Sequence, residues 1–172
     1  VGLMVTRSNT KYLVERTMNA DLAVKTCRIE VNTAARNLRE MLLLPNSSQY
    51  DEFEEKINTS IANIQSEVAL FKEAHGEEDG LAQTYEDAFD NWFSIANHAI
   101  SELKSGNKDE ATDIVLTECS PALSNLVDIS KQIDQTITAE KQEQQALTTG
   151  MLNLFVTVLC AVFIVVLCIS LY

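Results

Sequence analysis

Apolar side chains recur every three or four residues along four stretches of the chain, which is the spacing of one face of an α-helix. The four stretches cover residues 7–44, 50–74, 81–103 and a segment that begins near Asn107 and runs on into the C-terminal block. Turn-forming clusters separate them at 45–49, 75–80 and 105–108. Amphipathic helices joined by short turns pack as antiparallel neighbours. The pattern therefore predicts an all-α fold, an up-down-up-down antiparallel four-helix bundle in which helices 1 and 4 are long.

The apolar face of each stretch gives the predicted core. In the first three stretches its members are Val24, Cys27, Val31, Ala34, Ala35, Leu38 and Leu42, then Phe53, Ile57, Ile61, Ile64, Val68 and Phe71, then Tyr85, Phe89, Trp92, Ala96, Ala99 and Leu103. In the fourth they are Ile114, Val115, Leu126, Ile129, Ile133 and Ile137. Ser48 and Asp51 predict the start of the second helix, Gly106 the end of the third, and Asn107 with Glu110 a capping box for the fourth.

The C-terminal block differs from the rest of the chain in having no charge. Residues 144–172 contain no Asp, Glu, Lys or Arg, and residues 151–172 are apolar except for Asn153, Thr157 and Ser170. Twenty-two helical residues span roughly 33 Å, enough to cross a bilayer core of about 30 Å. We expect residues 149–172 to form a transmembrane helix that continues helix 4, in preference to a buried core helix. The apolar residues 1–5 are expected to end a preceding span, which leaves residues 6–148 as one polar domain.

Composition and charge exclude several classes of function. The chain has 5 Gly, 2 Pro and 6% aromatic residues, which argues against an all-β or doubly wound fold. Its net charge of −12 repels phosphate backbones, so no nucleic-acid partner is expected. His75 and His98 lack the spacing of a metal site or a catalytic base, and no phosphate loop or nucleophile motif occurs. We expect no catalytic residue, no metal and no cofactor.

A stripe of cationic and amide side chains borders the apolar face of the first helix. At 100° per residue, Arg28, Asn32, Arg36 and Arg39 fall within about 80° of one another. Guanidinium groups suit the bidentate binding of carboxylates. The stripe is thus a candidate site for a small anionic metabolite. The alternative is that these arginines pair with acidic residues on neighbouring helices.

Helix 4 can be placed against helix 1 by its rise. If both leave the membrane at Val5 and Gly150, residues at equal height have numbers that sum to about 155. The hydroxyls nearest the arginines are then those of Thr117, Ser120 and Ser124. Pro121, at the same height, removes a helix hydrogen bond and frees a carbonyl or kinks the helix.

The same rule places two cysteines apart. Cys27 and Cys119 differ in height by roughly 13 Å, too far for a disulfide within one chain. Tyr85, Phe89 and Trp92 are expected in the core, with a ligand pocket inside the bundle as a secondary possibility.

Three passages resemble one family of receptors. They are residues 32–57, the third segment with Tyr85 and Trp92, and residues 110–126 at the start of the fourth. In this order, and followed by an apolar helix, they are similar to the four-helix-bundle sensor domain and second transmembrane helix of methyl-accepting chemotaxis proteins. The resemblance covers residues 6–172.

The resemblance implies a membrane receptor whose residues 6–148 are extracytoplasmic. It implies a homodimer, a ligand held at the dimer interface by arginines of helix 1 and a threonine of helix 4, and cytoplasmic signalling proteins reached through a part beyond Tyr172. Arg28, Arg36 and Arg39 are the nearest equivalents of the family's arginines.

The function predicted from these observations is sensing of an extracellular organic acid or amino acid, with a displacement of helix 4 as output. Two alternatives are the sensor of a histidine kinase or cyclic-dinucleotide enzyme, and a membrane-anchored interaction module without a small ligand.

Overall fold

The computed structural model describes residues 2–75 and 80–170, with side chains for 16–74 and 80–170, and all regular structure within these ranges is helical. The elements are α1 (Gly2–Leu43), η1 (Ser47–Gln49), α2 (Tyr50–His75), α3 (Leu81–Lys104), α4 (Lys108–Ile114), η2 (Val115–Cys119) and α5 (Ser120–Ser170). η1 is a single 3₁₀ turn and η2 a π-helical turn, so α4, η2 and α5 form one continuous helix over residues 108–170. The predicted four-helix bundle is confirmed. Val1, residues 76–79 of the predicted turn and the last two residues lie outside the described residues.

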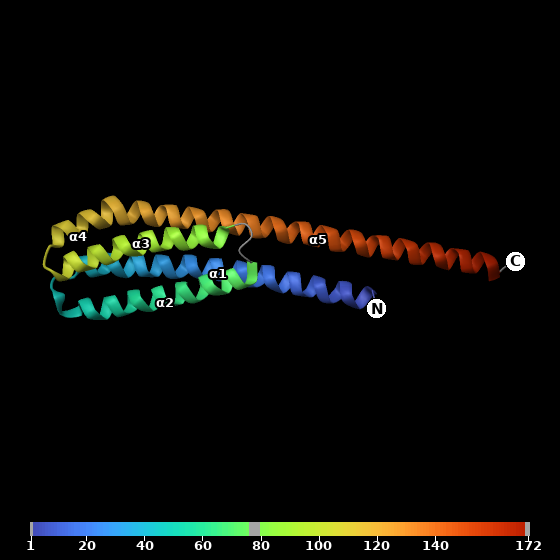
Figure 1. Ribbon diagram of the computed structural model, residues 1–172, viewed down its shortest axis with the longest axis horizontal. Coiled ribbons are helices and arrows are strands. Elements are labelled where there is room, and N and C mark those ends of the chain that lie inside the picture. The colour runs from blue at the N-terminus through green and yellow to red at the C-terminus, as the bar shows by residue number, and fades with distance from the viewer. Residues whose placement is uncertain (1, 76–79, 171–172) are drawn as a thin grey trace.

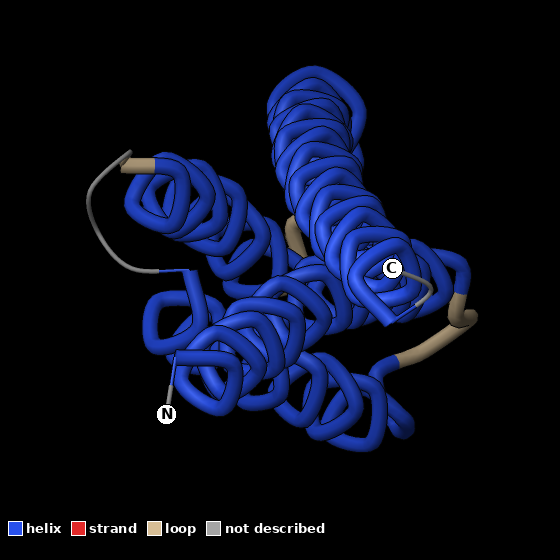
Figure 2. The backbone as a smooth tube through the Cα atoms, turned by 90° about the vertical axis from the view of Figure 1, so that its right-hand side faces the viewer, coloured by secondary structure: helices blue, strands red, loops and turns tan. Residues whose placement is uncertain are grey.

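The bundle is elongated, with α1 and α5 as its long members (Figure 1). The α1–α2 and α3–α4 connections lie at one end, while the chain termini extend from the other. Viewed along the long axis, the helices lie side by side as separate columns (Figure 2). This arrangement follows from the sequence, because each amphipathic helix buries its apolar face against its neighbours.

Nearly all of the side chains predicted for the core are buried. The core also contains residues outside the predicted set: Ala20, Ala23, Met41, Tyr50, Ala74, Ala82, Ile100, Ala111, Cys119 and Leu123. All the positions predicted for the core in the first and third stretches are buried. In the second stretch all are buried except Phe53, which is half-buried. Lys56 Nζ lies 4.6 Å from the centre of the Phe53 ring. In the fourth, Ile129 is half-buried and the others are buried. Trp92 lies at the centre, fully buried beside Phe89, with 6.4 Å between the two ring centres.

Two helix ends differ from the predicted caps. Asn46, not Ser48, provides the side-chain cap, because its Oδ1 accepts a hydrogen bond from Ser48 N and η1 then leads directly into α2. The Asn107 side chain donates to Glu102 Oε2 at 2.6 Å and so does not form the predicted capping box. Gly106 ends α3 as predicted, at φ 90°, which lets Asn107 N reach Glu102 O at 2.9 Å.

The π-turn η2 has a cause that can be read in the core positions. Ala111, Val115, Cys119 and Leu123 are all buried although they are spaced by four residues. Over twelve residues a regular α-helix would rotate such a face by about 120°, and a turn that takes one extra residue reduces this drift to about 20°. η2 supplies that residue, with Ser120 N bonded to Val115 O. The backbone irregularity predicted near Pro121 therefore occurs as a π-turn that ends just before the proline.

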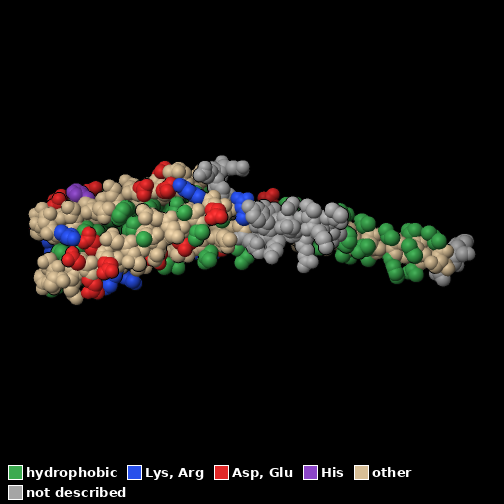
Figure 3. Space-filling model, turned by 60° about the horizontal axis from the view of Figure 1, so that its bottom comes forward, with side chains coloured by type: hydrophobic (Ala, Val, Ile, Leu, Met, Phe, Trp, Pro, Cys, Tyr) green, Lys and Arg blue, Asp and Glu red, His purple; other side chains and the backbone are tan. Residues whose placement is uncertain are grey.

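The C-terminal part of α5 carries the apolar block. It is the one helix in the described part of the chain that is long and apolar enough to cross a membrane, and none of its most apolar stretch is buried within the chain. Figure 3 shows hydrophobic side chains covering this arm, whereas charged side chains gather on the bundle.

Candidate functional site

The arginine stripe lies on one side of α1. Asn32, Arg36 and Arg39 are exposed and Arg28 is half-buried. They occupy this side because the opposite face of α1 carries the buried residues that pack on the other helices. The exposed Asn32 donates its side-chain amide to Arg28 O at 2.7 Å, within α1.

The three arginines have few carboxylate partners. Arg36 Nε lies 3.8 Å from Glu40 Oε1 on the same helix, and both side chains are exposed. Within the described residues, neither Arg28 nor Arg39 has an ion-pair partner. Cross-helix pairing is thus absent from all three, in a chain whose net charge is −12. The stripe presents two guanidinium groups, those of Arg28 and Arg39, whose charge no ion pair among the described residues neutralises.

The hydroxyl groups on the fourth helix are less available. Thr117 Oγ1 donates to Asp113 O at 2.9 Å and Ser120 Oγ to Val115 O at 2.8 Å, both within their own helix. Ser124 is exposed. No hydrogen bond between described residues joins the arginines to these hydroxyls. The hydroxyl protons of Thr117 and Ser120 are already used, so of these three side chains Ser124 is the one whose hydroxyl could donate to an anion beside the guanidinium groups.

The height relation between the helices agrees with two pairs of residues on α1 and the fourth helix. Asp21 on α1 and Asp134 on α5 have numbers that sum to 155, and both contact Lys25. Near the other end of the bundle, burial raises the pKa of Cys119, while the nearby Arg39 charge acts in the opposite direction. Arg39 therefore lies close to η2, within a turn of the predicted level.

An exposed apolar stripe on α1 was missed in the sequence. Leu22, Ile29 and Leu43 are 65%, 65% and 81% exposed, and with Arg36 they repeat every seven residues. This heptad spacing on the outer side of an already amphipathic helix was the available signal. The arginine stripe and these leucine and isoleucine side chains share one solvent-facing surface of α1.

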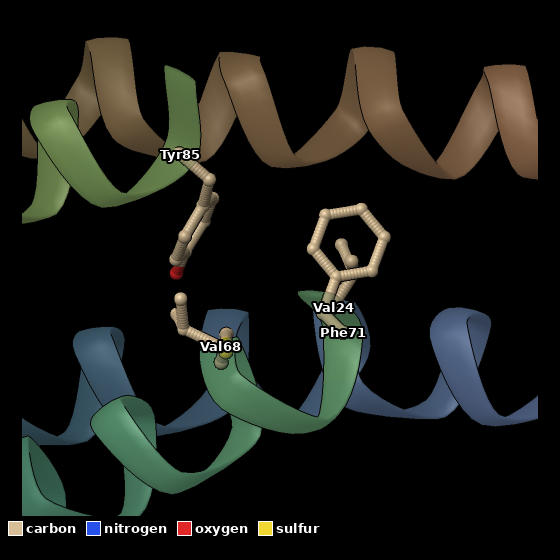
Figure 4. A pocket seen from close by; sticks show the side chains of 5 residues that line it. Val24, Val68, Phe71 and Tyr85 are labelled. Atoms are coloured by element: carbon tan, nitrogen blue, oxygen red, sulfur yellow. The ribbon is translucent and has the colours of Figure 1, made fainter. Parts of the chain in front are cut away.

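The bundle interior offers no room for a small molecule at Tyr85. The gap that Val24, Cys27, Val68, Phe71 and Tyr85 surround is too small to hold a water molecule. Figure 4 shows Tyr85 reaching from α3 towards α2 and α1, which fills the space. The aromatic residues thus serve as core here, and the secondary pocket hypothesis gains no support.

Each of the two bundle cysteines is buried beside an aromatic side chain. Both thiols are free. Burial raises the pKa of Cys27 to about 12, and the Tyr85 hydroxyl acts against this rise. Burial raises the pKa of Cys119 to about 11, and the Trp92 indole acts against it. The structure thus holds Cys27 and Cys119 as two separate buried thiols.

We expect both thiols to resist alkylation in the folded chain. At pH 8, shifts from 9.0 to about 12 and about 11 reduce the thiolate fraction by about a thousand-fold for Cys27 and about a hundred-fold for Cys119. Iodoacetamide labelling followed by peptide mass spectrometry measures each cysteine separately, with the urea-unfolded chain as control. Equal labelling rates in the folded and unfolded chain would contradict the buried environment.

The described residues contain no cluster of His, Cys, Asp and Glu able to hold a metal. His98 lies 3.8 Å from Glu102 on the same exposed helix face. The side chain of His75 lies outside the described part of the chain. The chemistry that the site offers is therefore charge recognition on the outside of α1.

Comparison with known proteins bears on this arrangement. A family model described as a four-helix-bundle sensory module for signal transduction matches residues 21–149. No curated protein and no solved structure gave a match. The matched range covers the bundle and both rows of predicted site residues.

Proposed function

Because this chain belongs to the family of four-helix-bundle sensory modules for signal transduction, found in methyl-accepting chemotaxis proteins, we propose that it senses a small anionic metabolite for a membrane receptor. Residues 6–148 are its extracytoplasmic sensor domain, 149–172 its transmembrane helix and 1–5 the end of a preceding span. The family is one of sensors and not of enzymes. The observation that carries the proposal is that, among the residues with described side chains, the α1 arginines form no ion pair with a neighbouring helix.

The ligand class follows from the chemistry of the stripe. Three guanidinium groups within twelve residues give several parallel N–H donors, which suits the carboxylates of an organic acid or amino acid. The surrounding acidic surface repels anions that the arginines do not hold in place. A carboxylate ligand is therefore bound most tightly where Arg36 and Arg39 contact it together.

The exposed apolar stripe supports a second copy of the chain as partner. Leu22, Ile29 and Leu43 repeat at the heptad interval of a helix pair, and two α1 helices that face each other would cover them. In such a homodimer the arginines of both copies border the interface, so a ligand contacts both chains. Thr117, Ser120 and Ser124 would border the same space from the fourth helix.

The output requires that ligand affinity differ between two arrangements of the bundle. The fourth helix passes the level of the arginines at η2 and continues without interruption into the apolar arm. A displacement of this helix thus carries the signal to cytoplasmic signalling proteins.

A thermal-shift screen of the full chain in lipid nanodiscs tests the proposal. The probes are amino acids, mono- and dicarboxylic acids and nucleobases, applied to wild type, Arg39→Ala and Lys131→Ala. A ligand at 100 times its Kd stabilises by about 2.7 kcal/mol. We expect a carboxylate to stabilise wild type, and its affinity to fall by about 30-fold or more in Arg39→Ala, because a charge-assisted pair is removed.

Lys131→Ala is the matched control, since Lys131 is an exposed cation that pairs with Asp128 on its own helix. It should respond as wild type does. A shift that is fully retained in Arg39→Ala and also in Arg36→Ala would contradict the proposed site. If no probe shifts any variant, ligand sensing is contradicted and the membrane-anchored interaction module is favoured.

A further inference from the structure

A three-residue ionic cluster links α1 to α5 below the arginine stripe. Lys25 Nζ lies 2.6 Å from Asp21 Oδ1 on its own helix and 3.6 Å from Asp134 Oδ1 on α5. Both carboxylate atoms are shielded from solvent, whereas the Lys25 side chain is 44% exposed. The lysine therefore sits over two inward-facing oxygens that belong to different helices.

The pKa of the Asp21 carboxyl depends on Lys25. Burial acts to raise the pKa of Asp21, but the hydrogen bond and charge of Lys25 outweigh it and hold that pKa below its ordinary value. Lys141 on α5 acts in the same direction. The hydrogen bond to Asp21 raises the pKa of Lys25. Asp21 and Lys25 thus hold each other in the charged form near neutral pH.

The other buried side chains of α5 near this level form no polar contact with α1 among the described residues. Leu126, Ile133 and Ile137 are buried apolar residues, and the buried Ser130 Oγ donates to Val127 O within α5. The hydrophobic effect that drives apolar packing is non-directional. An ion pair fixes position along the helix, because its energy depends on a single distance.

We propose that Lys25 is a latch that sets the axial register of α5 against α1 by holding Asp134 beside Asp21. The inference rests on the proposed function, in which movement of α5 carries the signal. The latch lies between the arginine level and the apolar arm, so a displacement of α5 has to change the Lys25–Asp134 contact. An axial shift of α5 by one residue is about 1.5 Å. This is larger than the difference between the Lys25–Asp21 distance of 2.6 Å and the Lys25–Asp134 distance of 3.6 Å.

The test measures the register directly, by the distance between spin labels on the full chain in nanodiscs. Labels are attached after Asn19→Cys and Asn125→Cys, both at exposed positions, with Cys160→Ala and Cys168→Ala in the apolar arm. The two labelled positions are offset along the bundle axis by roughly 16 Å, so an axial shift of α5 changes the distance between them. Labelled chain is diluted with unlabelled chain so that each distance lies within one copy. Wild type, Asp134→Asn, the exchange Lys25→Asp with Asp134→Lys, and Asp128→Asn are compared.

In Asp134→Asn we expect a second, shifted distance whose population is at least about five-fold greater than in wild type, the lower end of typical coupling between sites. The charge exchange should restore the wild-type distribution, because a cation at position 134 again faces a carboxylate on α1. Asp128→Asn should match wild type, since Asp128 pairs with Lys131 on its own helix.

Three results would overturn the latch: an unchanged distribution in Asp134→Asn, an equal change in Asp128→Asn, or an exchange variant that does not regain the wild-type distance. Helix content is checked for every variant by circular dichroism, and Lys25→Gln replaces Asp134→Asn if the latter does not fold. No ligand is added, so the outcome is independent of whether the arginines bind an anion.

Discussion

Replacement of Trp92 by alanine is expected to lower the free energy of unfolding by about 3–5 kcal/mol, the range for removing a buried aromatic side chain. Trp92 is fully buried and stands beside Phe89 from its own helix, with its indole next to Cys119 on η2. Its removal leaves a cavity where α3 meets the fourth helix. Thermal and urea unfolding of the full chain, followed by circular dichroism, measures the loss.

Phe93→Ala is the matched control for this prediction. Phe93 is a neighbouring aromatic residue, but it is half-buried and stacks on Phe89 with 6.0 Å between ring centres. We expect a clearly smaller loss, because less of its surface leaves water. Equal losses in the two variants would show that Trp92 does not occupy the centre of the core.

Deletion of Leu116 in a Pro121→Ala background is expected to leave the free energy of unfolding within about 1 kcal/mol of that of Pro121→Ala alone, because the deletion removes the one extra residue that η2 accommodates. One residue fewer turns η2 into regular α-helix, and Ala111 and Leu123 stay within about 20° of the same face. Pro121 is replaced because a proline inside a regular helix costs about 3 kcal/mol. Urea unfolding measures the stability.

The control deletes Asn125 in the same Pro121→Ala background. This deletion lies in regular α-helix and rotates the segment that contains Leu126, Ile133 and Ile137 by about 100° relative to the part above it. Either Leu126, Ile133 and Ile137 leave the core, or the contacts that η2 makes with the other helices break. The free energy of unfolding should fall by more than about 3 kcal/mol. If both deletions are equally harmful, η2 does not absorb an extra residue.

The fold was predictable because each helix has a single apolar face that its sequence periodicity reveals. Val24 to Leu42 and Tyr85 to Leu103 follow this rule without exception. Caps were predicted less well, since Asn46 and Ser48 are equally suited to capping and only the path of the chain decides between them. An irregularity was predicted near Pro121, but it was not identified as a π-turn. Recognising the π-turn requires comparing the buried positions before and after it along the same helix.

The candidate site was harder to read than the fold. The exposure of Asn32, Arg36 and Arg39 follows from helix geometry, but whether Arg28 and Arg39 find carboxylates depends on neighbouring helices whose rotation the sequence leaves open. The Lys25 cluster was overlooked for the same reason, because Asp21 and Asp134 are far apart in sequence and meet only through the packing of α1 on α5. The height relation between helices 1 and 4 would have paired Asp21 with Asp134, because their numbers sum to 155.

The place of Arg36 in the heptad series of α1 has a thermodynamic consequence. In the proposed dimer, Leu22, Ile29 and Leu43 favour association, while Arg36 at the same heptad position brings two like charges together. An anion bound between them removes this repulsion, so ligand binding and subunit association are linked processes. Sensitivity to the ligand would then increase with the density of receptors in the membrane, and a cell could tune its detection threshold through expression level alone.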